Sequence, residues 1–200
     1  FSKPVGCSSR RRMLQFQAMY PEATFAPIRG NVYTRLAKVD SGEYAATILA
    51  AAGLKRLGLE QRISRYFSVE EMIPSAGQGI LAIQGRRDRE IPFVKMVHSE
   101  ESAVLTRAEQ GFVATLGGGC SSPTAASAVL ENGKIKLRGL YYKEETGEVR
   151  IGSIEGEAEK AAELGRKLAE QLSGKPALSP LGKVYLIGSG PGDAGLFTLR

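Results

Sequence analysis

Several kinds of functional residue are scarce in this sequence. Its 200 residues contain no tryptophan, one histidine and two cysteines. A single histidine, His98, excludes a catalytic pair or a metal cluster built on histidines. Cys7 and Cys120 stand far apart without a C-x-x-C spacing, which argues against a zinc site and a disulfide framework. Free thiols are typical of a reducing compartment, so we expect a cytoplasmic protein.

Long apolar runs and a glycine or proline period are also missing. No run approaches the about 18 residues of a membrane span, and the first residues do not follow the signal-peptide pattern, so no membrane partner is expected. Hydrophobic residues make up 42% and charged residues 24%, which is an ordinary globular balance. A chain of this length can bury a core without disulfides.

Positive charge is concentrated at the start of the chain. Lys and Arg number 27 against 21 Asp and Glu, and residues 1–60 hold nine basic and four acidic residues. Such an imbalance favours an anionic partner, although a solvated basic face would look the same. Nucleic acid is disfavoured, because aromatic residues make up only 7% and do not alternate with basic ones.

Short apolar runs alternate with helical patterns in residues 1–78. We expect helices to begin at Ser9 and Asn31, which are common capping residues. This alternation predicts an α/β domain with a mostly parallel sheet. The predicted strands are 3–7, 24–28 and 45–50, and the predicted helices are 9–19, 31–39 and 54–59.

The remaining residues show a different pattern of predicted helices and strands. GILAI at 79–83 reads as another buried strand, and a helix is expected over 99–116. Asn132-Gly133 suits a type I′ hairpin turn, so strands should flank it, with a third strand at 148–154 and a helix at 157–172. These elements predict a small α+β domain. A linker-like stretch then leads to an apolar run at 183–187 and the glycine-rich GSGPGD.

Arginines gather where predicted strands give way to helices. Arg10, Arg11 and Arg12 occupy the first turn of a helix, where cations oppose the helix dipole. Free N–H groups and guanidinium groups at such a place bind carboxylate or phosphate, although some of these side chains could simply point into solvent.

Further basic residues follow the next two predicted strands. Arg29 and Arg35 flank the start of the second helix, and Arg56 follows the third strand. Ligands of open α/β sheets bind beyond the carboxyl ends of the strands. We therefore expect Arg11, Arg12, Arg29 and Arg56 to converge on one rim and hold a polyanion.

Cys120 stands between three glycines and the sequence SSP. The glycines remove side-chain bulk and would let a large group approach the backbone. Cys120 is thus either an exposed nucleophile or an inert buried thiol.

Four motifs make the sequence resemble a known family. VGCSSRRR, IRGNVYTRLAKVDSGEYAATILAAAGLKRLGL, IPSAGQGILAIQ and LGGGCSSP occur in the order and spacing of the hydroxymethylbilane synthases, or porphobilinogen deaminases. This resemblance extends over about residues 1–175. The tail GKVYLIGSGPGDAGLFTLR resembles the start of the uroporphyrinogen-III C-methyltransferases, which use S-adenosylmethionine. Together they indicate a fusion of two tetrapyrrole-pathway enzymes.

The resemblance implies a fold of hinged domains with ligand between them. Residues 1–78 would be the second domain, an α/β domain of the periplasmic-binding-protein-like type. Residues 79–98 would return to a first domain that this chain lacks, with Gly77 to Gly79 as a hinge. Residues 99–175 would be the α+β domain that bears the cofactor, and 176–200 the linker and truncated start of the methyltransferase.

The resemblance also implies an activity in heme biosynthesis. Four porphobilinogen units are condensed head to tail, with release of ammonia, on a dipyrromethane cofactor, to give hydroxymethylbilane. The cofactor would be attached to Cys120 through a thioether, and no metal is implied. The positions that match the cofactor- and substrate-binding residues of the family are Cys120, Ser9, Arg11, Arg12, Arg29, Gly30, Arg35 and Arg56.

Some positions depart from the family pattern. Arg10 stands where the family usually has an apolar residue, and Cys7, Gln84 and Gly117 replace a hydroxyl residue and two acids. The catalytic aspartate of the family belongs to the first domain, and no motif for it occurs here. We therefore expect this chain to be inactive without that domain, its partners being porphobilinogen and the oligopyrrole intermediates. The alternative is a non-catalytic anion-binding module of the same hinged fold, in which Cys120→Ser would change nothing.

Overall fold

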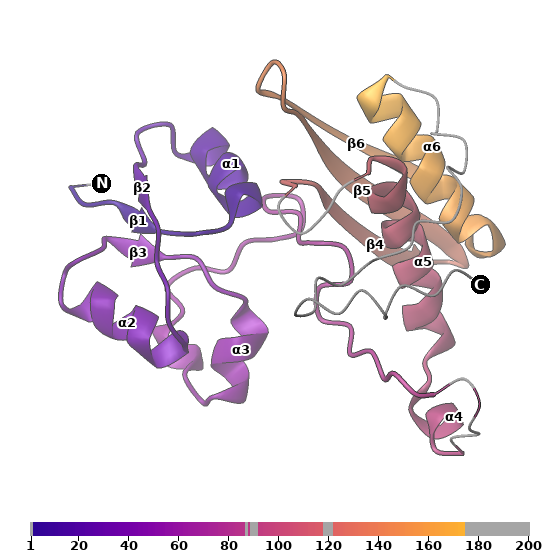
Figure 1. The fold of residues 1–200 in the computed structure, drawn as a ribbon, viewed down its shortest axis with the longest axis horizontal. Helices are drawn as coiled ribbons and strands as arrows, with labels where there is room; N and C mark the ends of the chain where they lie inside the picture. Colours follow the sequence, from indigo (N-terminus) through magenta and orange to yellow (C-terminus); the bar gives the residue numbers. More distant parts are fainter. Residues whose placement is uncertain (1, 87, 89–91, 118–121, 175–200) are drawn as a thin grey trace, which may run out of the picture.

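The computed structural model describes residues 2–86, 88, 92–117 and 122–174. Two units lie side by side in Figure 1, an α/β unit (residues 2–78) and an α+β unit (residues 100–174). A segment with a single short helix, α4 (Val94–Val97), joins them. Because Cys120 and residues 175–200 lie outside the described residues, the predictions for them are not addressed by the fold.

The α/β unit contains the predicted parallel sheet. Its strands are short and their order is β2-β1-β3, with Val5 of the central strand pairing with Phe25 on one side and Ala46 on the other. Two capping residues begin helices as predicted, since Ser9 precedes α1 and Asn31 precedes α2. In chain order the elements are β1 (Val5–Gly6), α1 (Arg10–Met19), β2 (Phe25–Ala26), α2 (Val32–Asp40), β3 (Ala46–Thr47), α3 (Ala51–Arg56) and the 3₁₀ turn η1 (Glu60–Arg62).

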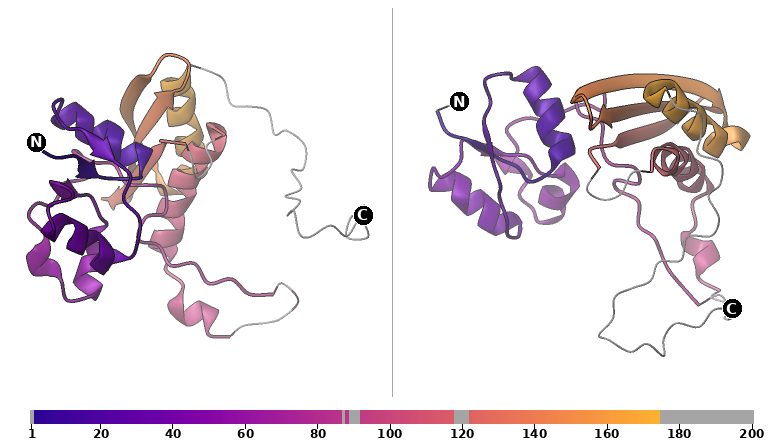
Figure 2. Two further views of the ribbon diagram at one scale, coloured as in Figure 1. Left: turned by 60° about the vertical axis from the view of Figure 1, so that its left-hand side comes forward. Right: turned by 45° about the horizontal axis from the view of Figure 1, so that its top comes forward.

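The α+β unit is an antiparallel sheet covered on one face by two helices (Figures 1 and 2). The predicted hairpin is confirmed, because Asn132 and Gly133 both have positive φ, at 51° and 78°, as a type I′ turn requires. The elements are α5 (Glu100–Thr115), β4 (Ala125–Glu131), β5 (Lys134–Lys143), β6 (Glu148–Glu157), the 3₁₀ turn η2 (Ala158–Lys160) and α6 (Ala161–Ser173).

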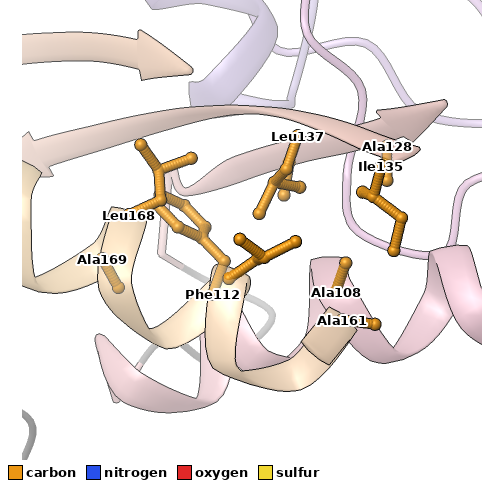
Figure 3. Packing of buried hydrophobic residues seen from close by; sticks show 10 residues of the cluster. Ala108, Phe112, Ala128, Ile135, Leu137, Ala161, Leu168 and Ala169 are labelled. Atoms are coloured by element: carbon orange, nitrogen blue, oxygen red, sulfur yellow. The ribbon is translucent and has the colours of Figure 1, made fainter. Parts of the chain in front are cut away.

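The core of the α+β unit is built around Phe112. Figure 3 shows its ring between the sheet and the helices, near Leu137 and Leu168, and all three side chains are buried. Close packing depends on two glycines. A Cβ on Gly139 would lie 2.6 Å from the Phe112 ring, and one on Gly165 would lie 2.1 Å from the carbonyl oxygen of Ala108.

The predicted buried strand at residues 79–83 is wrong. The structure has no strand there, and Leu81 is 85% exposed, with Ile80 and Ile83 also exposed. An apolar run forms a buried strand only when other strands pair with it, and none of the described residues does so. The same segment ends in α4, whose Met96 and Val97 are exposed as well.

Cys7 is a free thiol, as expected, and it is buried. His98 lies just before α5 and contacts Glu100. Among the described residues, no helix is long and apolar enough to cross a membrane.

Candidate functional site

The candidate site lies at the carboxyl edge of the parallel sheet. Strands β2 and β3 both run parallel to β1, so the three strand ends and the loops that follow them share one edge. Ser8 ties two of these loops together. Its hydroxyl donates to the Ile28 carbonyl at 2.9 Å and accepts from the Ile28 N–H at 3.1 Å. The loops before α1 and α2 are thereby held in a fixed relationship.

Ser9 occupies the N-cap position of α1 but does not cap the helix with its side chain. Its backbone is extended, with φ −95° and ψ 107°, and its hydroxyl forms no hydrogen bond within the described part of the chain. A serine at this position usually bonds an N–H of the first turn. The hydroxyl and the first N–H groups of α1 therefore have no partner among the described residues.

Arg11 and Arg12 are half-buried and turn inward from the first turn of α1. Arg11 donates to the Thr124 carbonyl at 2.8 Å, and Arg12 donates to the Ile48 carbonyl at 3.1 Å. Burial, reinforced by the charge of Arg12, lowers the pKa of Arg11. Neither guanidinium group forms an ion pair with any described residue. Two neighbouring half-buried cations that have no carboxylate partner among the described residues leave the site short of negative charge.

Arg35 and Gly30 form the second junction. The Nε of Arg35 donates to the Gly30 carbonyl at 2.8 Å, and the Asn31 side chain accepts from the Thr34 N–H at 2.9 Å. Gly30 has φ 113°, and a Cβ there would lie 2.7 Å from the Thr34 side chain, so the position requires glycine.

The Cys7 thiol lies at the first junction. Burial raises its pKa above the ordinary value of 9.0, while a hydrogen bond to the Ser9 carbonyl and the charges of Arg12 and Arg35 oppose the rise. The two junctions lie side by side because the Ser8 hydroxyl joins them through Ile28.

Arg29 and Arg56 are placed differently. Both are exposed, and neither makes a hydrogen bond or ion pair with the described residues. Arg56 is the last residue of α3, one helix away from the strand end. The structure thus places Arg11 and Arg12 in the first turn of α1 and Arg35 on the neighbouring α2, and leaves Arg29 and Arg56 as solvent-facing cations.

A cavity of about 740 Å³ opens beside Arg11 and Arg12. Its walls include Leu49 to Ala52, at the end of the β3–α3 loop and the start of α3, and Pro74 and Gln78 in the segment that follows η1. Arg29, Arg35 and Arg56 do not line this cavity. A mixed apolar and cationic lining fits a ligand with flat apolar rings and acidic arms.

Sequence reasoning missed two polar residues that shape this region. Gln15 is buried, accepts from the Ile73 N–H at 2.7 Å and donates to the Ile73 carbonyl at 3.0 Å. Gln78 lines the cavity and bonds Ser75. A glutamine flanked in the sequence by Leu14 and Phe16, one turn after Arg11, is the signal that could have identified Gln15. Among the described residues, no cluster of His, Cys, Asp and Glu could hold a metal ion.

Cys120 lies outside the described residues. The nearest described residues on either side of it are Gly117 and Ser122. Gly117, with φ 65°, follows the end of α5. Ser122 and Thr124 share a hydroxyl hydrogen bond of 2.6 Å. Thr124 is also the residue whose carbonyl accepts from Arg11. The predicted attachment position, Cys120, is therefore four residues in the sequence from Thr124, which contacts Arg11 directly.

Two protein-family models match the chain. "Porphobilinogen deaminase, dipyromethane cofactor binding domain" matches residues 2–92, and "Porphobilinogen deaminase, C-terminal domain" matches residues 103–174. The porphobilinogen deaminase of Ruminiclostridium cellulolyticum is 52% identical over 171 residues, which are 86% of this chain and 58% of that protein. That of Ruminiclostridium josui is 49% identical over 176 residues, covering 88% and 60%.

A more distant relative agrees. The porphobilinogen deaminase of Chromobacterium violaceum is 42% identical over 170 residues, which are 84% of this chain and 55% of that protein. The chain thus spans less than two thirds of the length of the relatives it matches. Its similarity nevertheless includes both the α/β unit and the α+β unit.

Proposed function

The chain belongs to the porphobilinogen deaminase family, and on that premise we propose that it takes part in the synthesis of hydroxymethylbilane from four porphobilinogen units, with loss of ammonia. One observation carries the proposal at the level of residues. Arg11 and Arg12 are half-buried beside a cavity and have no carboxylate partner among the described residues. Each pyrrole bears acetate and propionate arms, so a pyrrole chain supplies the missing negative charge.

The residues present fit a dipyrromethane group. Its carboxylates would be held by Arg11, Arg12 and Arg35, and the free hydroxyl of Ser9 would donate a hydrogen bond. Cys120 would hold the group through a thioether. When bound, the cofactor supplies the pyrrole end to which new units are added. Arg29, exposed beside the Arg35–Gly30 contact, together with Arg56, would serve the carboxylates of later units.

The proposal includes a further segment of the same enzyme. Ile80, Leu81 and Ile83 are exposed in a run that the sequence predicts to be a buried strand. A first domain would cover this run and pair with it, and would supply the catalytic aspartate that the resemblance implies. Ligand would then lie between hinged domains, with Gly77 to Gly79 as the hinge, and the 200 residues alone would not turn over porphobilinogen.

The test is to supply porphobilinogen to three samples. These are the chain alone, the chain mixed with the portion of the Ruminiclostridium cellulolyticum relative that it does not match, and the same mixture with Cys120→Ser. We expect hydroxymethylbilane only from the second sample. Steady production by the chain alone would refute the need for a partner segment. Turnover that survives Cys120→Ser would refute the attachment site, and anion binding without turnover in every sample would favour a non-catalytic module.

The tail supports a separate proposal about the parent protein. Residues 182–200, outside the described part, resemble the start of the uroporphyrinogen-III C-methyltransferases. We infer that a methyltransferase that uses S-adenosylmethionine is fused to the deaminase in the parent. Detection of both domains in one polypeptide, by its intact mass, would test this inference.

A further inference from the structure

Arg10 makes contacts that connect the two units. Its guanidinium group donates two parallel hydrogen bonds of 2.8 Å to the carboxylate of Glu144, and it lies 4.9 Å from the centre of the Tyr142 ring. Arg10 is the first residue of α1, whereas Tyr142 and Glu144 lie at the end of β5 and in the turn before β6. A bidentate, stacked guanidinium has a defined orientation, unlike a single flexible ion pair.

The rest of the interface between the units has little apolar packing. Its buried apolar cluster consists of Ile73, Ala125 and Leu140. Beside this cluster lies a groove of about 500 Å³, whose walls include Ala18 of α1 and Ile151 of β6. So small a cluster beside an open groove leaves the angle between the units to be set by directional polar contacts.

Backbone atoms accept or donate in most of those polar contacts. Arg11 reaches the Thr124 carbonyl, the Ala126 N–H donates to the Pro74 carbonyl at 3.1 Å, and Arg138 donates to the Glu70 carbonyl at 3.3 Å. Within the described residues, Arg10–Glu144 is the one ion pair that joins the α/β unit to the α+β unit.

The position of Arg10 on the helix gives the pair a second effect. A cation in the first turn of α1 opposes the helix dipole, and Arg10 is one of three consecutive arginines there. Glu144 places a carboxylate at the same helix end, where negative charge is favourable. Hydrogen bonding to Glu144 raises the pKa of Arg10, as expected for a paired guanidinium. The contact therefore relieves an electrostatic conflict that the arginine cluster creates.

We propose that Arg10, Tyr142 and Glu144 form a lock between the two units, in which Arg10 is a positioning residue. The lock holds the β5–β6 end of the sheet against α1, and thereby keeps Thr124 within reach of Arg11. The lock itself does not depend on the proposed function. Its consequence, a fixed distance between the arginine pair and the segment that contains Cys120, does.

The lock is tested by hydrogen exchange on the full chain, without any pyrrole present. Arg10→Leu and Glu144→Gln should each raise, by about two- to fivefold, the exchange rate of the Met13 amide, which donates to the Ser9 carbonyl, and of the hydrogen-bonded amides of Thr146 and Gly147 in the turn. The double variant should exchange no faster than either single variant, because both remove one contact. The charge-reversed pair, Arg10→Glu with Glu144→Arg, should restore slow exchange.

Glu145→Gln is the matched control. Glu145 lies in the same turn, carries the same charge, is exposed and makes no hydrogen bond or ion pair with the described residues, so its variant should exchange like the parent. The proposal is overturned if Glu144→Gln behaves like Glu145→Gln, or if the effects of Arg10→Leu and Glu144→Gln add. Since no pyrrole is used, failure here would leave the proposed function standing, and failure to make hydroxymethylbilane would leave the lock standing.

Discussion

The carboxylate of Glu109 accepts a hydrogen bond of 2.6 Å from the backbone N–H of Gly77, although 32 residues separate them in the sequence. Its other oxygen accepts from the Ala128 N–H at 2.8 Å. One side chain of α5 therefore joins Gly77, next to the cavity-lining Gln78, to β4, the first strand of the α+β unit. Glu109 is only 9% exposed, so the carboxyl is held in a poorly solvated place.

The Glu109 carboxyl should make stability depend on pH. Burial raises its pKa above the ordinary value of 4.5, and the two N–H donors offset only part of this rise. Between the unfolded and the folded pKa, the folded chain binds more protons than the unfolded chain, so its free energy of unfolding falls as pH rises through that window. The stability advantage of the parent over Glu109→Gln should therefore shrink from pH 4 upward, as measured by urea unfolding. An advantage that grows with pH would contradict this account.

The crossing of α5 and α6 should not tolerate a methyl group. A Cβ on Gly165 would lie 2.1 Å from the Ala108 carbonyl oxygen, so Gly165→Ala must separate the helices. We expect a loss of about 2 kcal/mol or more in the free energy of unfolding, measured with urea.

Gly53→Ala on α3 is the matched control for that variant. A Cβ on Gly53 would meet nothing within 4 Å. Alanine is the better helix former, so this variant should be neutral or more stable by up to about 1 kcal/mol. Equal losses from both variants would show that helix packing is not the cause.

Variants of the two N-cap residues, Ser9 and Asn31, should distinguish a role in ligand binding from a role in helix stability. Asn31 accepts from the Thr34 N–H at 2.9 Å, so Asn31→Ala should cost about 1 kcal/mol of stability. Ser9 makes no such bond, so Ser9→Ala should change the free energy of unfolding by less than about 0.5 kcal/mol. Ser9→Ala should instead reduce the fraction of chain that retains the cofactor, read from intact mass. A large loss of stability in Ser9→Ala would remove Ser9 from the proposed site.

Arg11 and Arg12 should contribute most of the affinity of the site for acidic pyrroles. Arg12→Ala should weaken binding of porphobilinogen to the Cys120→Ser chain by about 10-fold or more, because a charge-assisted contact to a carboxylate is lost. Arg12→Lys should keep part of the affinity, since it keeps the charge without the guanidinium fork. Calorimetric titration measures both.

Arg166→Ala is the control for the arginine pair. Arg166 lies on α6, paired with Glu170, and its removal changes the net charge by the same amount. Its variant should bind like the parent. If Arg166→Ala weakens binding as much as Arg12→Ala does, the effect is one of net charge and the site is not specific.

Local signals in the sequence predicted most of the fold. Asn31, Ser99 and the Asn132-Gly133 turn act on backbone groups within three residues of themselves, so their effects are visible in the sequence. The run 79–83 was predicted to be buried and is exposed, because burial of a strand depends on neighbours that its own residues do not specify.

The candidate site could also be predicted only in its local features. That arginines stand at strand ends could be predicted from spacing, and Arg11 and Arg12 do occupy the first turn of α1, directly after β1. That Arg11 would bond the Thr124 carbonyl could not, because those residues are 113 positions apart and meet only through the docking of two units. The bridging role of Gln15 was missed for the same reason, since Ile73 lies 58 positions away.

The most direct test of the central claim is the mass of the peptide that contains Cys120. The chain, mixed with the unmatched portion of the Ruminiclostridium cellulolyticum relative and given porphobilinogen, is digested and its peptides are weighed. The account predicts that this peptide gains the mass of one dipyrromethane, and that the gain disappears in Cys120→Ser. An unmodified Cys120 peptide in a mixture that makes hydroxymethylbilane, or the added mass on the peptide of Cys7, would contradict it.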